Sequence, residues 1–158
     1  MTAMTNPTPA DSPRCIELKI DSYAENLTPT RRAVEAFALG CGFDETSQGE
    51  IGLCVNEALA NVLRHAYGGA TGRPIAIRLE NMPDGIRIAV RDWGKGLNPM
   101  TLAPREQDPL RPGGIGLICL RELMDEIDFH PQTDGMMLTM IRRRQASRRR
   151  GQRTRDCG

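Results

Sequence analysis

The sequence has no apolar run that approaches the roughly 18 to 20 residues of a membrane-spanning helix. Its first residues, MTAMTNPTPADSPR, also lack the apolar block of a secretory signal. The 158 residues are 39% apolar and 26% charged, as in an ordinary soluble domain. We therefore expect a single cytoplasmic domain with a sizeable core and no membrane partner.

Paired cysteines and the common nucleotide-binding signatures are missing as well. The five cysteines are odd in number and scattered, and no two of them form a C-x-x-C pair. This pattern indicates neither a disulfide framework nor a zinc site. The chain has no G-x-x-x-x-G-K-[ST] motif, and its GGIG does not follow a predicted strand. Neither a P-loop nor a Rossmann fingerprint is therefore indicated, and internal repeats are absent.

The near-neutral net charge of +1 hides an asymmetry along the chain. From Arg142 onward there are eight arginines and one aspartate, a balance of +7, which leaves residues 1–141 with 13 basic and 19 acidic residues, a balance of −6. A tail this polar and like-charged cannot bury enough surface to fold. It could bind nucleic acid, an anionic membrane or an acidic partner, or it could simply be solvated.

Hydrophobic periodicity predicts a mixture of strands and helices. Strands are predicted for CIELKID, PIAIRLE, GIRIAVRD, IDFHP and MMLTMIR. Helices are predicted for TPTRRAVEAFALGCG with Thr28 or Thr30 as N-cap, from Thr46 or Ser47 to Tyr67, and for GLICLRELMDEI. The Pro- and Gly-rich stretch between Gly94 and Gly114 is longer than most loops and therefore indicates function. The fold class is α+β, a two-layer sandwich of a largely antiparallel mixed sheet with helices on one face.

Glu57 and Asn61 stand out in the predicted helix that contains NEALANVLRHAY. They are four residues apart, so they lie one above the other on the same side of the helix. An asparagine amide oxygen is a hard ligand for Mg²⁺, and a glutamate one turn away can accept a proton from an attacking hydroxyl. The same spacing also arises by chance on solvated helix faces, so both interpretations are open on spacing alone.

Two glycine-rich segments add to this pair. RDWGKG places Asp92 at a strand end, followed by Gly94 and Gly96, which allow the backbone to approach a ligand closely. RPGGIGL carries three more glycines at a predicted helix start: Gly113, Gly114 and Gly116. Unencumbered N–H groups and the helix dipole at such a position suit phosphate. Taken singly, such a segment is more often a turn or a helix stop.

Together and in this order, EALANVLRHAY, DWGKG and GGIGLICLRELMDEIDF resemble the ATP-binding site of the GHKL superfamily, which is built on the Bergerat fold. The similarity is closest to bacterial anti-sigma-factor serine kinases of the RsbW and SpoIIAB type, and it covers roughly Ile16 to Arg142. The resemblance implies a GHKL ATP-binding kinase domain at 15–142. Composition predicts a disordered N-terminal segment at 1–14 and a disordered Arg-rich tail at 143–158.

The resemblance also implies a role for each motif residue, with ATP and Mg²⁺ as cofactors. Asn61 would coordinate the Mg²⁺ that bridges the triphosphate, and Glu57 would be the base that activates the attacking hydroxyl. Asp92 would accept the adenine amino hydrogen, and Gly94 and Gly96 would shape the adenine pocket. An ATP lid over the phosphates would include Gly113, Gly114 and Gly116.

Some residues near these motifs are less clear from the sequence. Many superfamily members follow the glycine of the penultimate turn with a threonine that helps hold adenine through water, whereas Gly135 is followed here by Met136. Adenine binding is therefore expected to be weaker or differently arranged. Trp93 either lines the nucleotide pocket or makes a rigid core contact. His65 and Tyr67 are interpreted as packing or hydrogen-bonding residues.

The chain has no room for the further domains of gyrase or MutL, or for the dimerisation helix of a sensor histidine kinase. The resemblance therefore implies an anti-sigma factor that is a protein serine/threonine kinase. Its partners would be a STAS-domain anti-anti-sigma factor, which carries the acceptor serine, and a sigma factor. Arg31 lies where related kinases use an arginine to contact protein partners, although a solvated helix face is an equal alternative. The oligomeric state is open, a homodimer included.

Two other classes of function compete with this interpretation. The first is a non-catalytic module of the same fold that binds a partner in an ATP-dependent way. The second is nucleic-acid binding through the Arg-rich tail, for which a steep salt dependence would be the signature. We favour both less than the kinase.

Overall fold

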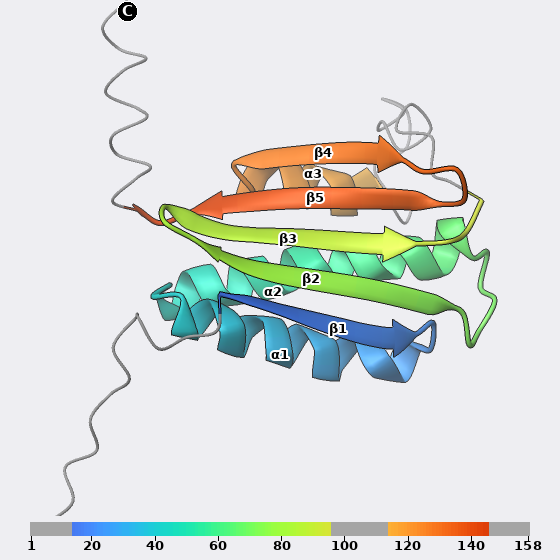
Figure 1. Cartoon of the computed structure of the whole chain (residues 1–158), viewed down its shortest axis with the longest axis horizontal. Helices are drawn as coiled ribbons and strands as arrows, with labels where there is room; N and C mark the ends of the chain where they lie inside the picture. The colour runs from blue at the N-terminus through green and yellow to red at the C-terminus, as the bar shows by residue number, and fades with distance from the viewer. Residues whose placement is uncertain (1–13, 96–113, 146–158) are drawn as a thin grey trace, which may run out of the picture.

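The computed structural model of the chain describes residues 14–95 and 114–145 (Figure 1). Its sheet has five strands in the order β1-β2-β3-β5-β4. They are β1 (Cys15–Asp21), β2 (Pro74–Met82), β3 (Gly85–Asp92), β4 (Glu126–Pro131) and β5 (Met136–Arg143). All four neighbouring pairs are antiparallel. The predicted α+β class is confirmed, and the described sheet is antiparallel throughout rather than mixed.

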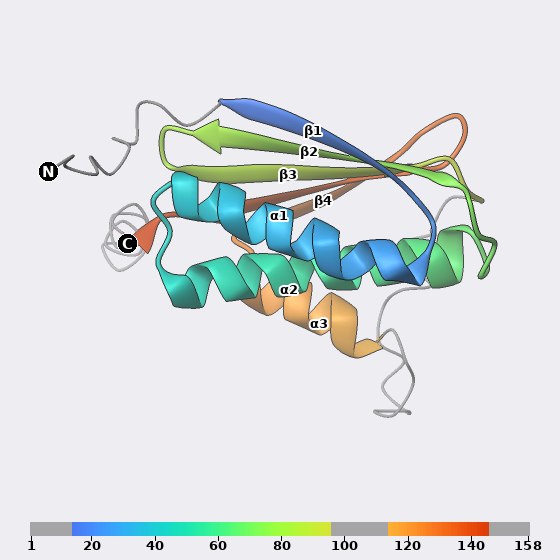
Figure 2. The ribbon, with the colours of Figure 1, turned by 90° about the horizontal axis from the view of Figure 1, so that it is seen from below.

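Three helices cover one face of the sheet and complete the two predicted layers (Figure 2). They are α1 (Leu27–Gly40), α2 (Glu45–Asn61) and α3 (Gly114–Leu123), with a short 3-10 helix, η1 (Ala24–Asn26), before α1. The second predicted helix is divided, because α2 is continued by a five-residue π-helix, η2 (Val62–Ala66). Within residues 14–95 and 114–145, no helix combines the length and apolar character needed to cross a bilayer.

The core lies between the sheet and the helices, and the alternation of the strands builds it. Side chains two apart along a strand point to the same face, and on this face the strands bury Ile75, Ile77, Leu79, Ile86, Ile88, Val90, Leu138 and Met140. The helices add Val34 from α1 and Ile51, Val55 and Leu59 from α2. Each fully buried aliphatic side chain contributes about 1.5–3 kcal/mol. The helix α2 and the strand β3, which carry the motif residues, are therefore held in place by buried apolar side chains.

The start of α1 differs from the predicted N-caps, whereas α2 begins close to the predicted residues. The carboxylate of Asp44 caps α2 by accepting a hydrogen bond from the Ser47 backbone N–H at 2.8 Å. This hydrogen bond is also the main reason that the pKa of Asp44 is lowered. This helix was predicted to begin near Thr46 or Ser47, within two residues of its observed first residue, Glu45. For α1 the N-cap is Asn26, without a side-chain cap bond, rather than Thr28 or Thr30.

The folded part of the chain continues past the boundary expected from the sequence. β5 includes Arg143, and the backbone N–H of Arg144 donates to the Asp84 carbonyl at 2.9 Å. The Arg144 guanidinium donates to the Cys41 carbonyl and to Asn81 Oδ1, both at 2.7 Å. These contacts tie the strand end to α1 and to the β2–β3 hairpin. Arg143 and Arg144, which the sequence placed in the tail, thus contact the body.

Candidate functional site

The C-terminal ends of α2 and β3 and the start of α3 lie at the same end of the molecule (Figures 1 and 2). α2 ends at Asn61, β3 ends at Asp92 and α3 begins at Gly114. These are the three segments that carry the sequence motifs. The fold therefore brings together residues that are far apart in the sequence, and it does so at the end of the sheet opposite to the last residues of β5.

Asn61 is buried at the last residue of α2, with 6% of its surface exposed. Its Oδ1 atom is one of two buried side-chain atoms in the described ranges without a hydrogen-bond partner, the other being Thr139 Oγ1. Thr139 lies in the middle of β5, and its neighbour Leu138 packs into the core, so Thr139 faces away from the helices. Only the unpaired oxygen of Asn61 is thus at the motif end, where a ligand could complete it.

Glu57 lies one helical turn before Asn61 and is half-buried. Its carboxylate makes no hydrogen bond or ion pair with any residue that the structure describes. Both residues are on α2, whose Val55, Ala58 and Leu59 are buried in the core. Among the described residues, therefore, no hydrogen bond of the fold uses the Glu57 carboxylate or the Asn61 amide oxygen.

Asp92 is the last residue of β3 and is 2% exposed. Its Oδ1 accepts a hydrogen bond from the Gly94 backbone N–H at 2.9 Å. Burial raises the pKa of Asp92, while hydrogen bonds from the backbone of Gly94 and Met136 act in the opposite direction. Met136 is also directly opposite Asp92 in the β3–β5 ladder and is buried. Because its side chain is a thioether, it has no hydroxyl group to donate a hydrogen bond to Asp92. Burial and polar contacts together hold the carboxylate in one place.

The π-helix connects Asn61 to the Asp92 segment. Its Ala66 carbonyl accepts a hydrogen bond from the Lys95 N–H at 3.1 Å. A Cβ atom at Gly94 would overlap this same carbonyl, so only glycine fits there. The residue after the π-helix, Tyr67, donates from its backbone N–H to the Val62 carbonyl at 3.0 Å. π-Helical turns inside α-helices are frequent at functional sites. Here Ala66 of the π-helix packs against Gly94, just after the end of β3.

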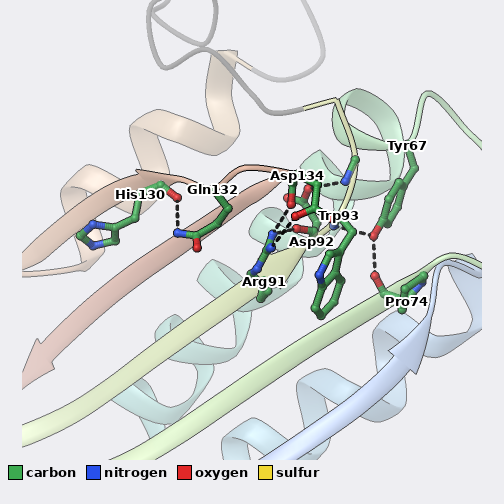
Figure 3. Close-up of polar contacts among 9 residues, drawn as sticks. Tyr67, Pro74, Arg91, Asp92, Trp93, His130, Gln132 and Asp134 are labelled. Carbon is green, nitrogen blue, oxygen red and sulfur yellow. Dashed lines mark hydrogen bonds and ion pairs between the residues drawn. The ribbon is translucent and has the colours of Figure 1, made fainter.

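The aromatic residues of the motifs lie on the outer side of this end. The Tyr67 hydroxyl makes hydrogen bonds, as predicted, with Pro74 and Trp93 (Figure 3), whereas His65 is exposed. Trp93 is 41% exposed, so it is not a core contact. It lines a hollow of about 700 Å³ together with residues of β1 and the start of β2. Glu57, Asn61 and Asp92 do not line this hollow within the described part of the chain.

The remaining predicted residues are placed as follows. Gly114 and Gly116 are in the first turn of α3, and Gly96 and Gly113 lie outside the described residues. Arg31 is in α1, which starts soon after β1 ends, and β1 ends beside Pro74 at the same end of the sheet as Asp92. Its Nε atom pairs with Glu35 Oε1 at 2.9 Å, and 39% of its side chain is exposed.

The sequence did not predict that two residues, Arg91 and Gly135, contact the Asp92 segment. The guanidinium of Arg91 donates to the Asp92 carbonyl, and Gly135, at a φ of +94°, lies so close that a Cβ atom would overlap the same carbonyl. The turn signal at Gly135 was visible in QTDG, but its contact partner depends on strand order. The alternation of β3 shows only that Arg91 points away from the core.

Comparison with known proteins shows the family of the chain. The model of the histidine kinase-like ATPase domain matches residues 20–142. The serine-protein kinase RsbW of Bacillus pumilus is 31% identical over 138 residues, which cover 80% of this chain and 84% of that protein. The serine-protein kinase RsbW of Oceanobacillus iheyensis is 29% identical over 133 residues, which cover 79% and 84%. The chain therefore belongs to the histidine kinase-like ATPase domain family.

A solved structure supports the same fold. The structure of the RsbU and RsbW domains of Rv1364c from Mycobacterium tuberculosis aligns with a TM-score of 0.57 at 18% sequence identity. The aligned part covers 82% of this chain and 32% of that longer chain. The resemblance to the GHKL superfamily and to RsbW-type kinases is thus confirmed, and the curated relatives confirm the predicted enzyme class, a protein serine/threonine kinase. ATP binding follows from the family.

Proposed function

We propose that the protein is an anti-sigma factor that uses Mg-ATP to phosphorylate a serine of a STAS-domain anti-anti-sigma factor. Within the described ranges, the buried Oδ1 of Asn61 has no hydrogen-bond partner and the Glu57 carboxylate, one turn away, has no hydrogen bond or ion pair, and this observation carries the proposal. It is supported by the relatives, which are serine-protein kinases. The adenine would be bound by Asp92, which is buried at the adjacent strand end.

The Asn61 site fits a magnesium ion. In nucleotide sites Mg²⁺ is usually held by one or two protein ligands, substrate phosphates and waters. No group of three or more His, Cys, Asp or Glu side chains that could hold a metal occurs in the part of the chain that the structure describes. Asn61 Oδ1, an amide oxygen with no partner among the described residues, could provide one such protein ligand.

Each residue would then have one task in the transfer. Bound Mg-ATP supplies the phosphoryl group. Glu57 accepts the proton of the attacking serine hydroxyl, and the serine oxygen becomes bonded to phosphorus as ADP leaves. Asp92 accepts hydrogen bonds from the adenine amino group. Gly94 and Gly96 would shape the adenine pocket. The lid over the phosphates would involve Gly113, Gly114 and Gly116, whose backbone N–H groups suit anions.

The exchange of partners would follow from charge. Phosphorylation adds about −1.5 to −2 charges to the antagonist, and an acidic kinase body would then release it. Release frees the kinase to bind the sigma factor by mass action. Arg31 lies at the same end of the sheet and is our candidate for a partner contact, while a homodimer stays open.

Nucleic-acid binding by the body is less favoured because its arginines on the open sheet face are paired with acids. Arg78 and Arg87 pair with Glu80, at 2.8 and 3.3 Å. Arg143 pairs with Glu126 at 2.9 Å. Such paired charges offer little net positive potential to a phosphate backbone.

The test is phosphate transfer from labelled Mg-ATP to the antagonist that co-purifies with the protein from its host. We expect wild type to label a serine of the antagonist. Glu57→Gln should bind ATP normally but transfer phosphate roughly 10²- to 10⁴-fold more slowly. A matched control is Asn56→Ala, a half-buried residue beside Glu57 on the same helix, which should keep its rate. ATP-dependent capture of the antagonist without labelling would instead identify a non-catalytic binding module.

A further inference from the structure

One peptide group at the site end is held by side chains at both of its polar atoms, the carbonyl of Asp92 and the N–H of Trp93 (Figure 3). The carbonyl accepts a hydrogen bond from Arg91 Nη1. The N–H donates to the Tyr67 hydroxyl oxygen at 3.0 Å. Because these two atoms belong to the same planar peptide, the two contacts fix the orientation of that plane. The plane in turn sets the direction in which the Asp92 side chain leaves the backbone.

The role of the Tyr67 hydroxyl is determined by its two partners. It donates its only proton to the Pro74 carbonyl at 2.5 Å, and it can therefore only accept from the Trp93 N–H. Tyr67 directly follows the π-helix that begins after Asn61. The hydroxyl thus joins three elements: the segment after α2, the start of β2 and the end of β3.

Arg91 fixes the same peptide from the side of the β4–β5 turn. Besides the Asp92 carbonyl, Nη1 donates to the Asp134 carbonyl at 2.8 Å, and Nη2 pairs with Asp134 Oδ1 at 3.6 Å. The guanidinium also lies over the Trp93 ring, 4.6 Å from its centroid. Only 19% of this side chain is exposed. Planar stacking and several directed donors leave Arg91 little freedom.

We propose that Tyr67 and Arg91 are positioning residues of the adenine site, which orient the Asp92 carboxylate by fixing the Asp92–Trp93 peptide and so set the preference for adenine. The proposal rests on the proposed role of Asp92 in binding adenine. It offers a structural substitute for the threonine that the chain lacks after Gly135, because Met136 has no hydroxyl to help order the base. Neither Tyr67 nor Arg91 needs to touch the nucleotide.

Tyr67→Phe tests the proposal because it removes only the hydroxyl group. We expect the Kd for Mg-ATP, measured by calorimetry, to rise about 3- to 10-fold, the factor that corresponds to one hydrogen bond. The Kd for Mg-GTP, which lacks the adenine amino group, should change less, so the ATP:GTP preference falls. The KM for ATP should rise while kcat at saturating ATP stays within about 2-fold of wild type, because Glu57 and Asn61 are unchanged.

The chain offers matched controls for both side chains. Tyr23 is the other tyrosine and is 44% exposed, so Tyr23→Phe should keep the wild-type Kd values. Arg91→Met keeps the aliphatic stem of Arg91 but removes its donors, and it should lower the ATP:GTP preference as Tyr67→Phe does. Arg87→Met changes an arginine on the same face of β3 that pairs with Glu80 instead, and it should not. Arg91→Met also decides the matter if Tyr67→Phe does not fold.

The outcome that overturns the proposal is a lower melting temperature of Tyr67→Phe with unchanged Kd values and an unchanged ATP:GTP preference. The contacts would then hold the fold alone. Asp92→Asn in the same assay separates this failure from that of the proposed function. If Asp92→Asn loses ATP while Tyr67→Phe and Arg91→Met do not, only the positioning role fails. If Asp92→Asn keeps ATP, the adenine assignment itself fails.

Discussion

At the end of the sheet where β5 stops, the buried guanidinium of Arg142 has several partners, whereas at the end where β3 stops the buried amide oxygen of Asn61 has none among the described residues. Arg142 Nη2 donates to Glu50 Oε2 at 2.6 Å and to Ser47 Oγ at 3.5 Å. Its Nη1 donates to the Leu123 carbonyl. One strand end thus ties α2 and α3 to the sheet, and the other leaves a polar group open.

The difference separates residues that hold the fold from residues that we propose to bind a ligand. A buried polar group with internal partners contributes to stability, and a buried group without a partner costs about 1–3 kcal/mol. A ligand that completes the unpaired group recovers this free energy as affinity. The same helix carries both kinds of residue, because Ser47 and Glu50 lie near the start of α2, and Glu57 and Asn61 lie near its end.

The largest effect is expected from removing the Arg142 guanidinium at the end of the sheet where β5 stops. Arg142→Ala leaves Glu50 without its partner, and we expect the free energy of unfolding in urea to fall by about 3–5 kcal/mol. Arg87→Ala, which breaks a surface ion pair with Glu80, should cost about 1 kcal/mol or less. The folded fraction of Arg142→Ala should bind ATP as wild type does. A loss no greater than that of Arg87→Ala would show that the contacts of Arg142 do not hold the fold.

The reciprocal change is Asn61→Ala. We expect the affinity for Mg-ATP in calorimetry to fall by more than the roughly 10- to 100-fold typical of a lost outer-shell metal partner. The free energy of unfolding should stay within about 1 kcal/mol of wild type, because the removed oxygen has no hydrogen-bond partner in the described part of the chain. Asn56→Ala is the control on the same helix. Intact binding in Asn61→Ala, or a stability loss like that of Arg142→Ala, would place Asn61 with the structural residues.

The titration of Asp92 should make both the free energy of unfolding and the ATP affinity depend on pH. Its native pKa is raised above 3.8 by burial, so between 3.8 and the native value the folded state binds more protons than the unfolded state. The free energy of unfolding should therefore fall as the pH rises through this interval. Asp92→Asn should remove this fall and be at least as stable as wild type at neutral pH. ATP affinity of wild type should weaken as the pH drops and the carboxylate is protonated.

Urea titrations from about pH 4 to pH 7 and calorimetry over the same range test this prediction. Asp128→Asn, on the exposed strand β4, is the control and should keep the pH dependence of wild type. A wild-type pH profile in Asp92→Asn would mean that another group is responsible. Unchanged ATP affinity in this variant would contradict the assignment of the adenine pocket.

Much of the fold could be predicted from the sequence because periodicity depends on local pattern. The strands from Pro74 and from Gly85 were predicted within two residues of their observed ends, since alternating apolar residues directly determine which face is buried. The division of the second helix was not predicted; the π-helix at Val62–Ala66 packs against Gly94, a contact between distant parts of the chain that a local pattern does not reveal.

The candidate site shows the same limit. Glu57, Asn61, Asp92 and Gly94 were found as motif residues by resemblance, but nothing local indicates that the Asn61 oxygen is unpaired and that of Asp92 is bound to Gly94. Arg91 was missed because its partner, Asp134, lies 43 residues away and meets it only through strand order. The extent of the C-terminal arginines was missed because composition does not distinguish a paired arginine from a solvated one.

The smallest expected effect concerns those arginines. Truncation after Gln145 removes 146–158, and we expect a free energy of unfolding within about 0.5 kcal/mol of wild type, unchanged ATP binding and a near wild-type rate of phosphate transfer. Positioning around the triphosphate determines that rate, and the described chain leaves the sheet at the end opposite to Asp92. At most a salt-sensitive contribution to association with the antagonist should be lost.

Truncation after Arg142 is the matched comparison, because it also removes the hydrogen bonds of Arg144 to Cys41 and Asn81. It should lower the free energy of unfolding by about 1–3 kcal/mol. Equal stability of the two truncated proteins would show that the contacts of Arg143 and Arg144 do not stabilise the fold. A loss of turnover in the protein truncated after Gln145, measured at saturating antagonist, would place the tail in the catalytic machinery.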